Sequence, residues 1–299
     1  MEFATHDRNL AHGLGLTPAV ELVLTTDAHE GPVYVAGEHA LYVTVEGGLR
    51  RIDLGARRAA DLACSVVRPN GMFLDHEGRL VVCEQGDIEH PARISRLDLH
   101  TGDLTTIVAE LGGLPLNSPN DVVVGPDGVI WFTDPCYGYL QGFRPRPQLG
   151  DFVHRFDPAT GRHDIVADGF DKPNGIALSP DGAVLYVSDS GANHEPGSFD
   201  PRRPHHIRAF DVAGNRLTNG RLFAVTTPGF PDGIKVDAEG RVYASSFGGV
   251  QVFDAAGGLI GEIVLPGAVN FCFGGAERNV LFITTDTAVW AAVIDTKGD

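Results

Sequence analysis

The 299-residue sequence is poor in cysteine, in positive charge and in long apolar runs. Its four cysteines are too few and too scattered for a disulfide framework, and none of them forms a CxxC pair typical of a zinc or redox site. Lys and Arg total 23 against 39 Asp and Glu, which gives a formal net charge of −16. Because no basic cluster is present, neither nucleic acid nor an anionic membrane is expected as a partner.

The apolar runs are equally short. None approaches the length of about 18 residues that a membrane-spanning helix needs, and the N-terminus lacks the basic start and apolar stretch of a signal peptide. With cysteines that suit a reducing compartment, a cytoplasmic location is expected. The oligomeric state is not encoded in any feature of the sequence that we recognise.

Helical periodicity is scarce as well, which excludes an alternating β-α architecture. Glycine and proline are abundant instead, at 38 and 19 residues, and indicate many turns. Short runs rich in β-branched and aromatic residues recur between Gly, Asp, Asn or Pro, as in VIWFTDP, VLYVSDS and VLFITTD. The composition therefore predicts an all-β fold with many short strands.

An internal repeat organises these strands. Four blocks, at 70–78, 120–128, 174–182 and 232–240, align without gaps, and each places an Asn or Asp eight positions before a turn glycine. Two weaker copies begin at Glu30 and Asn270, so that the six starting residues are 38 to 58 positions apart. That spacing is the size of a four-stranded propeller blade with its loops. The repeat predicts a six-bladed β-propeller of four-stranded antiparallel blades.

The two ends of the chain are predicted to meet. The last unit has room for only about three strands after Asn270, whereas the run at 20–26 precedes the first unit without a blade of its own. We therefore expect this N-terminal strand to complete the last blade and close the ring, which removes exposed sheet edges. Residues 20–299 would then form a single domain, with residues 1–19 as an N-terminal extension.

The residues that start the six units form the candidate site, and we call them the anchors. Equivalent positions in a propeller lie at one level around the axis, so their side chains should converge. They combine two carboxylates with four amides, a set of hard oxygen donors that suits Ca²⁺ or Mg²⁺, tolerates Mn²⁺ and is less usual for Zn²⁺. An alternative is that Asn-Gly and Asp-Gly pairs merely begin strands, but six in register favour a site. The anchors are Glu30, Asn70, Asn120, Asn174, Asp232 and Asn270.

The same segments resemble a known family. E-G-P-V-Y at 30–34, L-N-S-P-N-D at 116–121, K-P-N-G at 172–175 and P-D-G-I at 231–234 are similar to motifs of the regucalcin/gluconolactonase family. The stretch NSPNDVVVGPDGVIWFTDPCYG is most similar to the bacterial gluconolactonase branch, and paraoxonase and diisopropylfluorophosphatase are more distant relatives. The resemblance covers nearly the whole chain from about residue 20 onward.

The resemblance implies a hydrolase that opens a sugar-acid or related lactone at a single divalent cation, with Ca²⁺ expected and Mg²⁺, Mn²⁺ or Zn²⁺ as alternatives. A small-molecule lactone or ester is the expected partner. Whether the catalytic carboxylate deprotonates water or only holds the metal stays open. Carried over by motif, the metal ligands are Glu30, Asn120, Asn174 and Asp232, with Asp232 also the catalytic carboxylate. Asn70, Asp121, Tyr137 and Asn270 are predicted to contact the substrate.

Two other functions remain open at this point. One is hydrolysis of aryl esters or phosphotriesters at the same metal, and the other is a non-catalytic propeller that binds calcium. The complete set of carboxylates and amides favours a hydrolase, because a scaffold has no need of carboxylates around its axis.

Two insertions, 135–152 and 190–206, are predicted to cover one end of the channel. Their arginines could attract a carboxylate- or phosphate-bearing substrate. The histidines outside the repeat are interpreted as solvated loop residues instead of catalysts. The arginines are Arg144, Arg146, Arg202 and Arg203, and the histidines are His154, His163, His194, His205 and His206.

Overall fold

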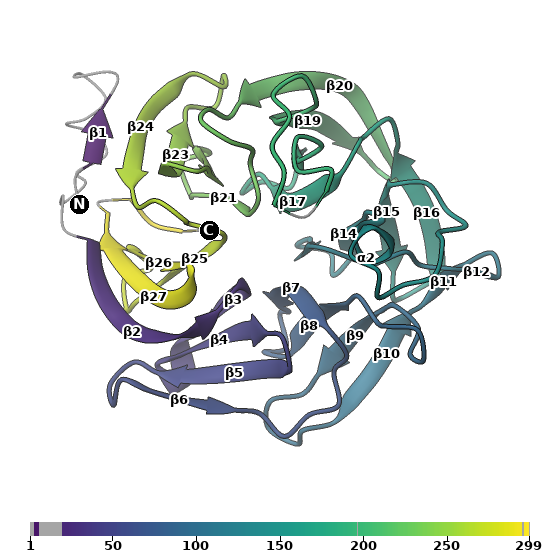
Figure 1. The fold of residues 1–299 in the computed structure, drawn as a ribbon, viewed down its shortest axis with the longest axis horizontal. Helices are drawn as coiled ribbons and strands as arrows, with labels where there is room; N and C mark the ends of the chain where they lie inside the picture. The colour runs from purple at the N-terminus through teal and green to yellow at the C-terminus, as the bar shows by residue number, and fades with distance from the viewer. Residues whose placement is uncertain (1–2, 6–19, 196, 295, 299) are drawn as a thin grey trace.

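Six four-stranded antiparallel units are arranged in a ring, as the repeat predicts (Figure 1). The computed structural model describes residues 3–5, 20–195, 197–294 and 296–298. Within these ranges, the neighbouring strands of every blade pair antiparallel. The predicted six-bladed β-propeller is confirmed.

Each blade runs outward from the axis in chain order. The innermost strands are β3 (Glu30–Val35), β7 (Pro69–Leu74), β13 (Val122–Val124), β17 (Pro173–Leu178), β21 (Ile234–Val236) and β25 (Phe271–Gly274). The second strands are β4 (Ala40–Val45), β8 (Leu80–Glu84), β14 (Ile130–Asp134), β18 (Val184–Asp189), β22 (Val242–Ser245) and β26 (Val280–Thr284). The third strands are β5 (Gly48–Asp53), β9 (Arg93–Leu97), β15 (Phe152–Asp157), β19 (His206–Ala213), β23 (Gly249–Phe253) and β27 (Asp286–Val293). The outermost strands are β6 (Arg58–Asp61), β10 (Leu104–Val108), β16 (Arg162–Ala167), β20 (Arg216–Val225), β24 (Leu259–Val264) and β2 (Val20–Ala28).

The N-terminal strand closes the ring. β2 pairs antiparallel with β27, with Glu21 opposite Ala291 and Thr25 opposite Ala288, and so becomes the outer strand of the sixth blade. The predicted closure is confirmed. Of the predicted extension over residues 1–19, only β1 (Phe3–Thr5) lies within the described residues, where it pairs with β24. The domain boundary itself stays a prediction.

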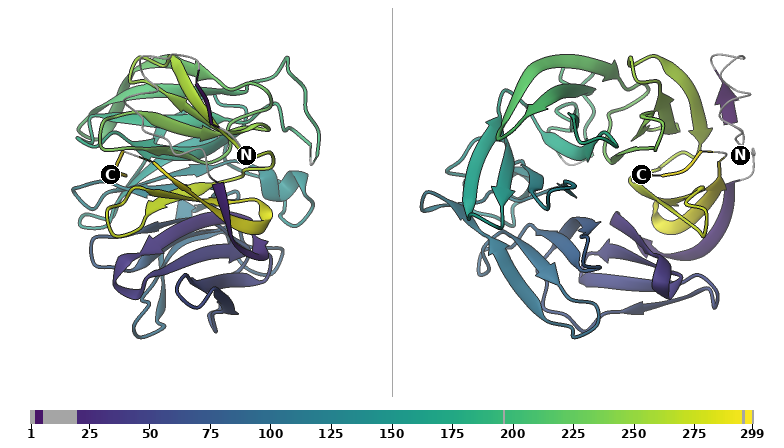
Figure 2. Two further views of the ribbon diagram at one scale, coloured as in Figure 1. Left: turned by 90° about the vertical axis from the view of Figure 1, so that its left-hand side faces the viewer. Right: turned by 180° about the vertical axis from the view of Figure 1, so that it is seen from behind.

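The described ranges contain little other regular structure. A minor hairpin joins β11 (Glu110–Leu111) and β12 (Leu114–Pro115), and two single turns of helix, η1 (Ala36–Glu38) and α2 (Tyr137–Leu140), lie in connections. Within the same ranges, no helix is both long and apolar enough to cross a bilayer. α2 and the segment after β18 project from the same face of the ring (Figure 2).

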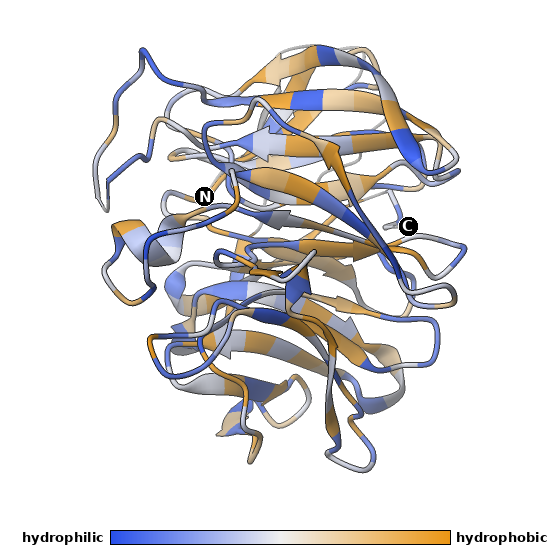
Figure 3. Ribbon diagram, turned by 90° about the vertical axis from the view of Figure 1, so that its right-hand side faces the viewer, coloured by the Kyte–Doolittle hydropathy of each residue, from blue (hydrophilic) through white to orange (hydrophobic). Residues whose placement is uncertain are grey.

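The hydrophobic core lies between the blades. Side chains alternate between the two faces of each strand, so every blade presents apolar residues to both neighbours. Val81 and Ile94 of the second blade pack with Ile130 and Phe132 of the third, and all four are fully buried. Hydrophobic positions follow the strands, whereas the connecting loops are largely hydrophilic (Figure 3).

Around the axis, neighbouring innermost strands approach closely at the anchors. The backbone N–H of Gly71 donates to the carbonyl oxygen of Asn120, 2.7 Å away. A Cβ atom built on Gly71 would lie 2.6 Å from that oxygen, so a side chain does not fit. Hydroxyl groups make a second link, since Thr133 Oγ1 donates to the carbonyl of Asn174 at 2.7 Å and Ser188 Oγ to that of Asp232 at 3.1 Å. The backbone of one blade therefore fixes the anchor of the next.

This close approach makes Gly71 a sensitive position. We expect Gly71→Ala to lower the free energy of unfolding by about 1–3 kcal/mol, because the new methyl group must push the next blade away. Gly37→Ala is the matched control, since nothing lies within 4 Å of a Cβ built there, and its effect should stay within about 0.5 kcal/mol. Urea denaturation of both variants checks this. Equal stability of the two variants would contradict the proposed contact.

Candidate functional site

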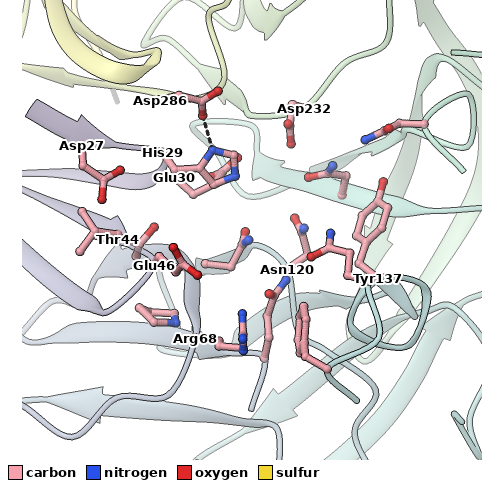
Figure 4. A pocket seen from close by; sticks show the side chains of 18 of the residues that line it. Asp27, His29, Glu30, Thr44, Glu46, Arg68, Asn120, Tyr137, Asp232 and Asp286 are labelled. Carbon is pink, nitrogen blue, oxygen red and sulfur yellow. Dashed lines mark hydrogen bonds and ion pairs between the residues drawn. The ribbon is translucent and has the colours of Figure 1, made fainter. Parts of the chain in front are cut away.

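Five of the six anchors meet at one cavity. Its volume is about 600 Å³, and it lies where the innermost strands begin (Figure 4). The sixth anchor, Asn270, lies behind it and donates from Nδ2 to Oε2 of Glu30 at 2.6 Å. The structure thus brings the predicted ligand set together. The anchors that line the cavity are Glu30, Asn70, Asn120, Asn174 and Asp232.

The Glu30 carboxylate is buried and held from two sides. Besides the Asn270 amide, the backbone N–H of Gly31 donates to the same oxygen at 3.0 Å. Asn270 is itself fixed, because its Oδ1 accepts from the backbone N–H of Phe271 at 2.7 Å and from Lys235 Nζ at 3.4 Å. Asn270 therefore acts on the cavity through Glu30.

Asp232 sits in a strongly unfavourable environment for a negative charge. Burial raises its pKa well above the ordinary range of an aspartate, and the neighbouring charge of Glu30 raises it further. A hydrogen bond from Asn174 and the charge of His29 act in the opposite direction but do not offset the rise. Bringing a cation between Glu30 and Asp232 would remove this repulsion.

An unsatisfied polar atom also marks the cavity. Asn70 Oδ1 is buried and has no hydrogen-bond partner among the described residues. The described residues contain no metal-type cluster of three or more His, Cys, Asp or Glu, so the set here is two carboxylates supplemented by amides. Such hard oxygen donors fit Ca²⁺ or Mg²⁺. Glu30, Asn120, Asn174 and Asp232 could hold the ion.

The remaining predicted substrate residues fall into two groups. Tyr137, at the start of α2, lines the cavity. Asp121 does not: it is buried next to the axis, where its Oδ2 lies 3.8 Å from Lys235 Nζ. Burial raises the pKa of Asp121 to about 6, although the charge of Lys235 lowers it. Asp121 and Asn270 are thus placed to support the cavity, and their contact with substrate stays a prediction.

Carboxylates at the ends of the second strands position the loops before the anchors. Asp134 is fully buried, and its two oxygens accept the backbone N–H groups of Asn117 and Ser118, each at 2.8 Å. Asp189 makes an equivalent pair of bonds in the loop before Asn174. Because each carboxylate satisfies two otherwise buried donors, it fixes the path of the chain into the site.

Replacing one of these carboxylates should loosen the fold. Asp134→Asn keeps the shape but places an NH₂ group against a backbone N–H, so we expect the free energy of unfolding to fall by about 2 kcal/mol. Asp103→Asn is the control, because Asp103 is exposed. Urea denaturation measures both. A loss in Asp134→Asn no larger than in the control would show that the carboxylate does not hold the loop.

The sequence analysis missed a histidine–aspartate pair at the edge of the cavity. His29 Nδ1 lies 2.5 Å from Asp286 Oδ1, and both residues line the cavity (Figure 4). Burial lowers the pKa of His29, but the hydrogen bond to Asp286 and the charges of Glu30 and Asp232 outweigh it, so that the pKa is about 9. His29 directly precedes the first anchor, Glu30, and this position in the sequence could have identified it as a residue of the site. Asp286 could be found only through the pairing of β2 with β27.

The prediction for the inserted arginines is wrong. None of the four lines the cavity. Arg144 is buried and donates to backbone carbonyls, including that of Asn117 at 3.0 Å. Arg203 pairs with Asp171 and Arg202 with Asp200, while Arg146 is exposed. Arg144, Arg202 and Arg203 are thus bound to other groups of the protein.

Three of the histidines also lie on strands: His154 on β15, His163 on β16 and His206 at the start of β19. His154 is fully buried on β15 and stacks on Phe132 with ring centroids 4.8 Å apart. Its Nδ1 lies 3.0 Å from Nε2 of His163 on β16. Burial lowers the pKa of His154 to about 3, so it is a neutral core residue.

The insertions do reach the site, as predicted. Gln141 and Phe143 from 135–152 line the cavity, and so do Asn193 and Gly197 from 190–206. The cavity is therefore built from two kinds of structure. The anchors lie at or just before the start of the innermost strands, and much of the rim comes from the loops.

Known proteins are similar to this chain in sequence and in fold. The sequence profile of the family described as SMP-30/Gluconolactonase/LRE-like region matches residues 28–287. A gluconolactonase from Zymomonas mobilis is 31% identical over 240 residues, which cover 73% of this chain and 63% of that protein. The lactonohydrolase oryL from Aspergillus oryzae is 29% identical over 90% of this chain and 69% of its own length. Among solved structures, a gluconolactonase from Xanthomonas campestris has a TM-score of 0.83 at 33% identity, covering 98% of this chain and 95% of that chain.

The fold and site together define a six-bladed β-propeller with a cluster of oxygen donors around one end of its axis. Since the family profile covers most of the sequence, the chain belongs to the SMP-30/gluconolactonase/LRE-like family. The predicted resemblance is confirmed. The alignment spans slightly less than two thirds of the Zymomonas relative.

Proposed function

We propose that this protein is a lactonase that opens a sugar-acid or related lactone at one divalent cation in the anchor cavity. The observation that carries the proposal is the convergence of two carboxylates and three amides on one cavity. The relatives named gluconolactonase and lactonohydrolase support the choice of substrate. A small-molecule lactone fits a cavity of this volume. A cytoplasmic location remains our expectation.

Glu30, Asn120, Asn174 and Asp232 would hold the cation, with Ca²⁺ the preferred ion for this donor set. When bound, the ion supplies Lewis-acid polarisation of the lactone carbonyl. The two carboxylates balance its charge, and the support that Asn270 gives to Glu30 keeps one ligand in place.

The side chains of the cavity would orient the attacking water and bind the substrate. Asp232 is positioned to orient the attacking water or to accept its proton. Tyr137 and Asn70 line the cavity and would contact hydroxyl groups of the sugar ring. Attack forms a bond from water oxygen to the carbonyl carbon. Cleavage of the ring C–O bond then leaves a carboxylate and a hydroxyl group.

Hydrolysis should depend on the metal and on Asp232. We expect chelator-treated protein to be inactive toward D-glucono-1,5-lactone, and addition of Ca²⁺, Mg²⁺ or Mn²⁺ to restore activity in a pH-indicator assay. Asp232→Ala should lower kcat by at least about 100-fold, because it removes both a ligand and the carboxylate next to the water. Asp103→Asn serves as the control.

Other outcomes separate the competing functions. Strong activity on aryl esters or phosphotriesters with weak lactonase activity would favour the esterase alternative. A folded protein that binds a metal but hydrolyses no lactone or ester would favour a non-catalytic calcium-binding propeller.

Metal binding can be measured without catalysis. Asn270→Ala removes the amide that holds Glu30, and we expect it to weaken Ca²⁺ affinity by about 10- to 100-fold in calorimetric titration. Ca²⁺ should also raise the unfolding temperature of the wild type more than that of the variant. Asn215→Ala, on an exposed turn, is the control. Equal affinities in both variants would show that Asn270 has no part in positioning Glu30.

A further inference from the structure

Most cations near the cavity are neutralised by the protein. Lys235 lies 3.8 Å from Asp121, His29 pairs with Asp286, and Arg203 pairs with Asp171. Because these positive charges are paired with carboxylates of the protein, they attract an anionic ligand only weakly.

Arg68 is different. It lines the cavity and is exposed, and within the described residues its side chain forms neither an ion pair nor a hydrogen bond. Its guanidinium therefore offers an uncompensated charge to whatever enters the cavity.

The guanidinium is nevertheless held in place. Arg68 Cζ lies 4.3 Å from the centroid of the Phe143 ring. The Arg68 carbonyl accepts the backbone N–H of Gln85 at 3.0 Å, which fixes the backbone next to the anchor Asn70. Stacking occupies the face of the guanidinium and leaves its N–H edge available, and that edge matches the geometry of a carboxylate or phosphate.

Most acids of the cavity lie away from Arg68. Asp27 and Asp286 come from the sixth blade, whereas Glu46, in the connection between β4 and β5, is drawn between them and Arg68 (Figure 4). Arg68 lies on the opposite side of the cavity from Asp232 and Asp286 (Figure 4). Near it in the fold, the second and third blades contribute the uncharged amides Gln85 and Gln141 to the lining.

We propose that Arg68 determines specificity by binding an anionic substituent at the end of the substrate remote from the lactone carbonyl. The substrate class is then a sugar lactone that carries a carboxylate or a phosphate. This rests on the proposed lactonase function, which places the carbonyl at the Glu30–Asp232 side. The shared chemistry is a planar or tetrahedral oxyanion that accepts hydrogen bonds from the guanidinium edge.

Matched substrates test the proposal and distinguish the two anions. D-Glucaro-1,4-lactone and D-glucono-1,4-lactone differ in a terminal carboxylate, and 6-phospho-D-glucono-1,5-lactone and D-glucono-1,5-lactone differ in a terminal phosphate. We expect the wild type to prefer one charged lactone over its neutral partner. Arg68→Gln should lower kcat/KM for that lactone by about 10- to 100-fold, mostly through KM, and for the neutral one by less than about threefold.

Arg146→Gln is the matched control, because Arg146 is exposed, lies in the same insertion as Phe143 and is not part of the cavity lining. It removes the same charge and should leave the preference unchanged. Equal losses in the two variants would mean that general electrostatic attraction is responsible, and the proposal would be wrong. It would also be wrong if the wild type had no preference for either charged lactone.

A binding measurement separates this proposal from the lactonase proposal. Calorimetry with D-glucarate, 6-phospho-D-gluconate and D-gluconate needs no turnover. If no lactone is hydrolysed but a charged acid binds to the wild type and not to Arg68→Gln, the lactonase proposal fails and the anion site stands. If neutral lactones are hydrolysed and Arg68→Gln changes neither binding nor kinetics, the anion site fails and the lactonase proposal stands.

Discussion

The pairing of β2 with β27 is the interaction on which the site depends. It joins the two ends of the chain in one blade, and β2 is followed almost at once by His29 and Glu30. Thr284 of the sixth blade then donates to the His29 carbonyl at 2.8 Å, and Asn270 donates to Glu30 at 2.6 Å. Without this closure the first anchor would have no neighbour on one side. The strand pairing that closes the ring therefore also fixes the geometry of the Glu30 carboxylate.

The closed ring also creates an electrostatic cost. It holds Glu30 and the partly buried Asp232 close together at the cavity wall, with Asp121 buried nearby. The charge of Glu30 raises the pKa of Asp232, and such repulsion destabilises the folded chain. A cation between the carboxylates would relieve this repulsion, so binding of the ion and stability of the ring should be linked. The backbone hydrogen bond of Gly71 and the side-chain hydrogen bond of Thr133 link neighbouring blades and resist movement of the anchors away from one another.

The fold could be predicted from the sequence because the repeated residues occupy positions that the backbone of each blade requires. An Asn or Asp before a strand and a glycine at a turn recur in four blocks, and two weaker copies that begin at Glu30 and Asn270 completed the six anchors. The repeat did not single out Arg68 or Asp286, since neither is an anchor. Charge alone was misleading for Arg144, because its partners are backbone carbonyls supplied by the fold. His154 was misjudged because its burial depends on which face of β15 meets Phe132.

The cavity residues proposed to act in the reaction and those proposed to select the substrate lie on different parts of the fold. The anchors lie at or just before the start of the innermost strands, and contacts from neighbouring blades fix their backbone. Arg68 and Phe143 come from connections of different blades, and their stacking spans the gap between those blades. Connections tolerate substitution and changes in length better than strands do. A propeller of this kind can therefore alter the remote end of its substrate while the carboxylates and amides around the axis stay in place.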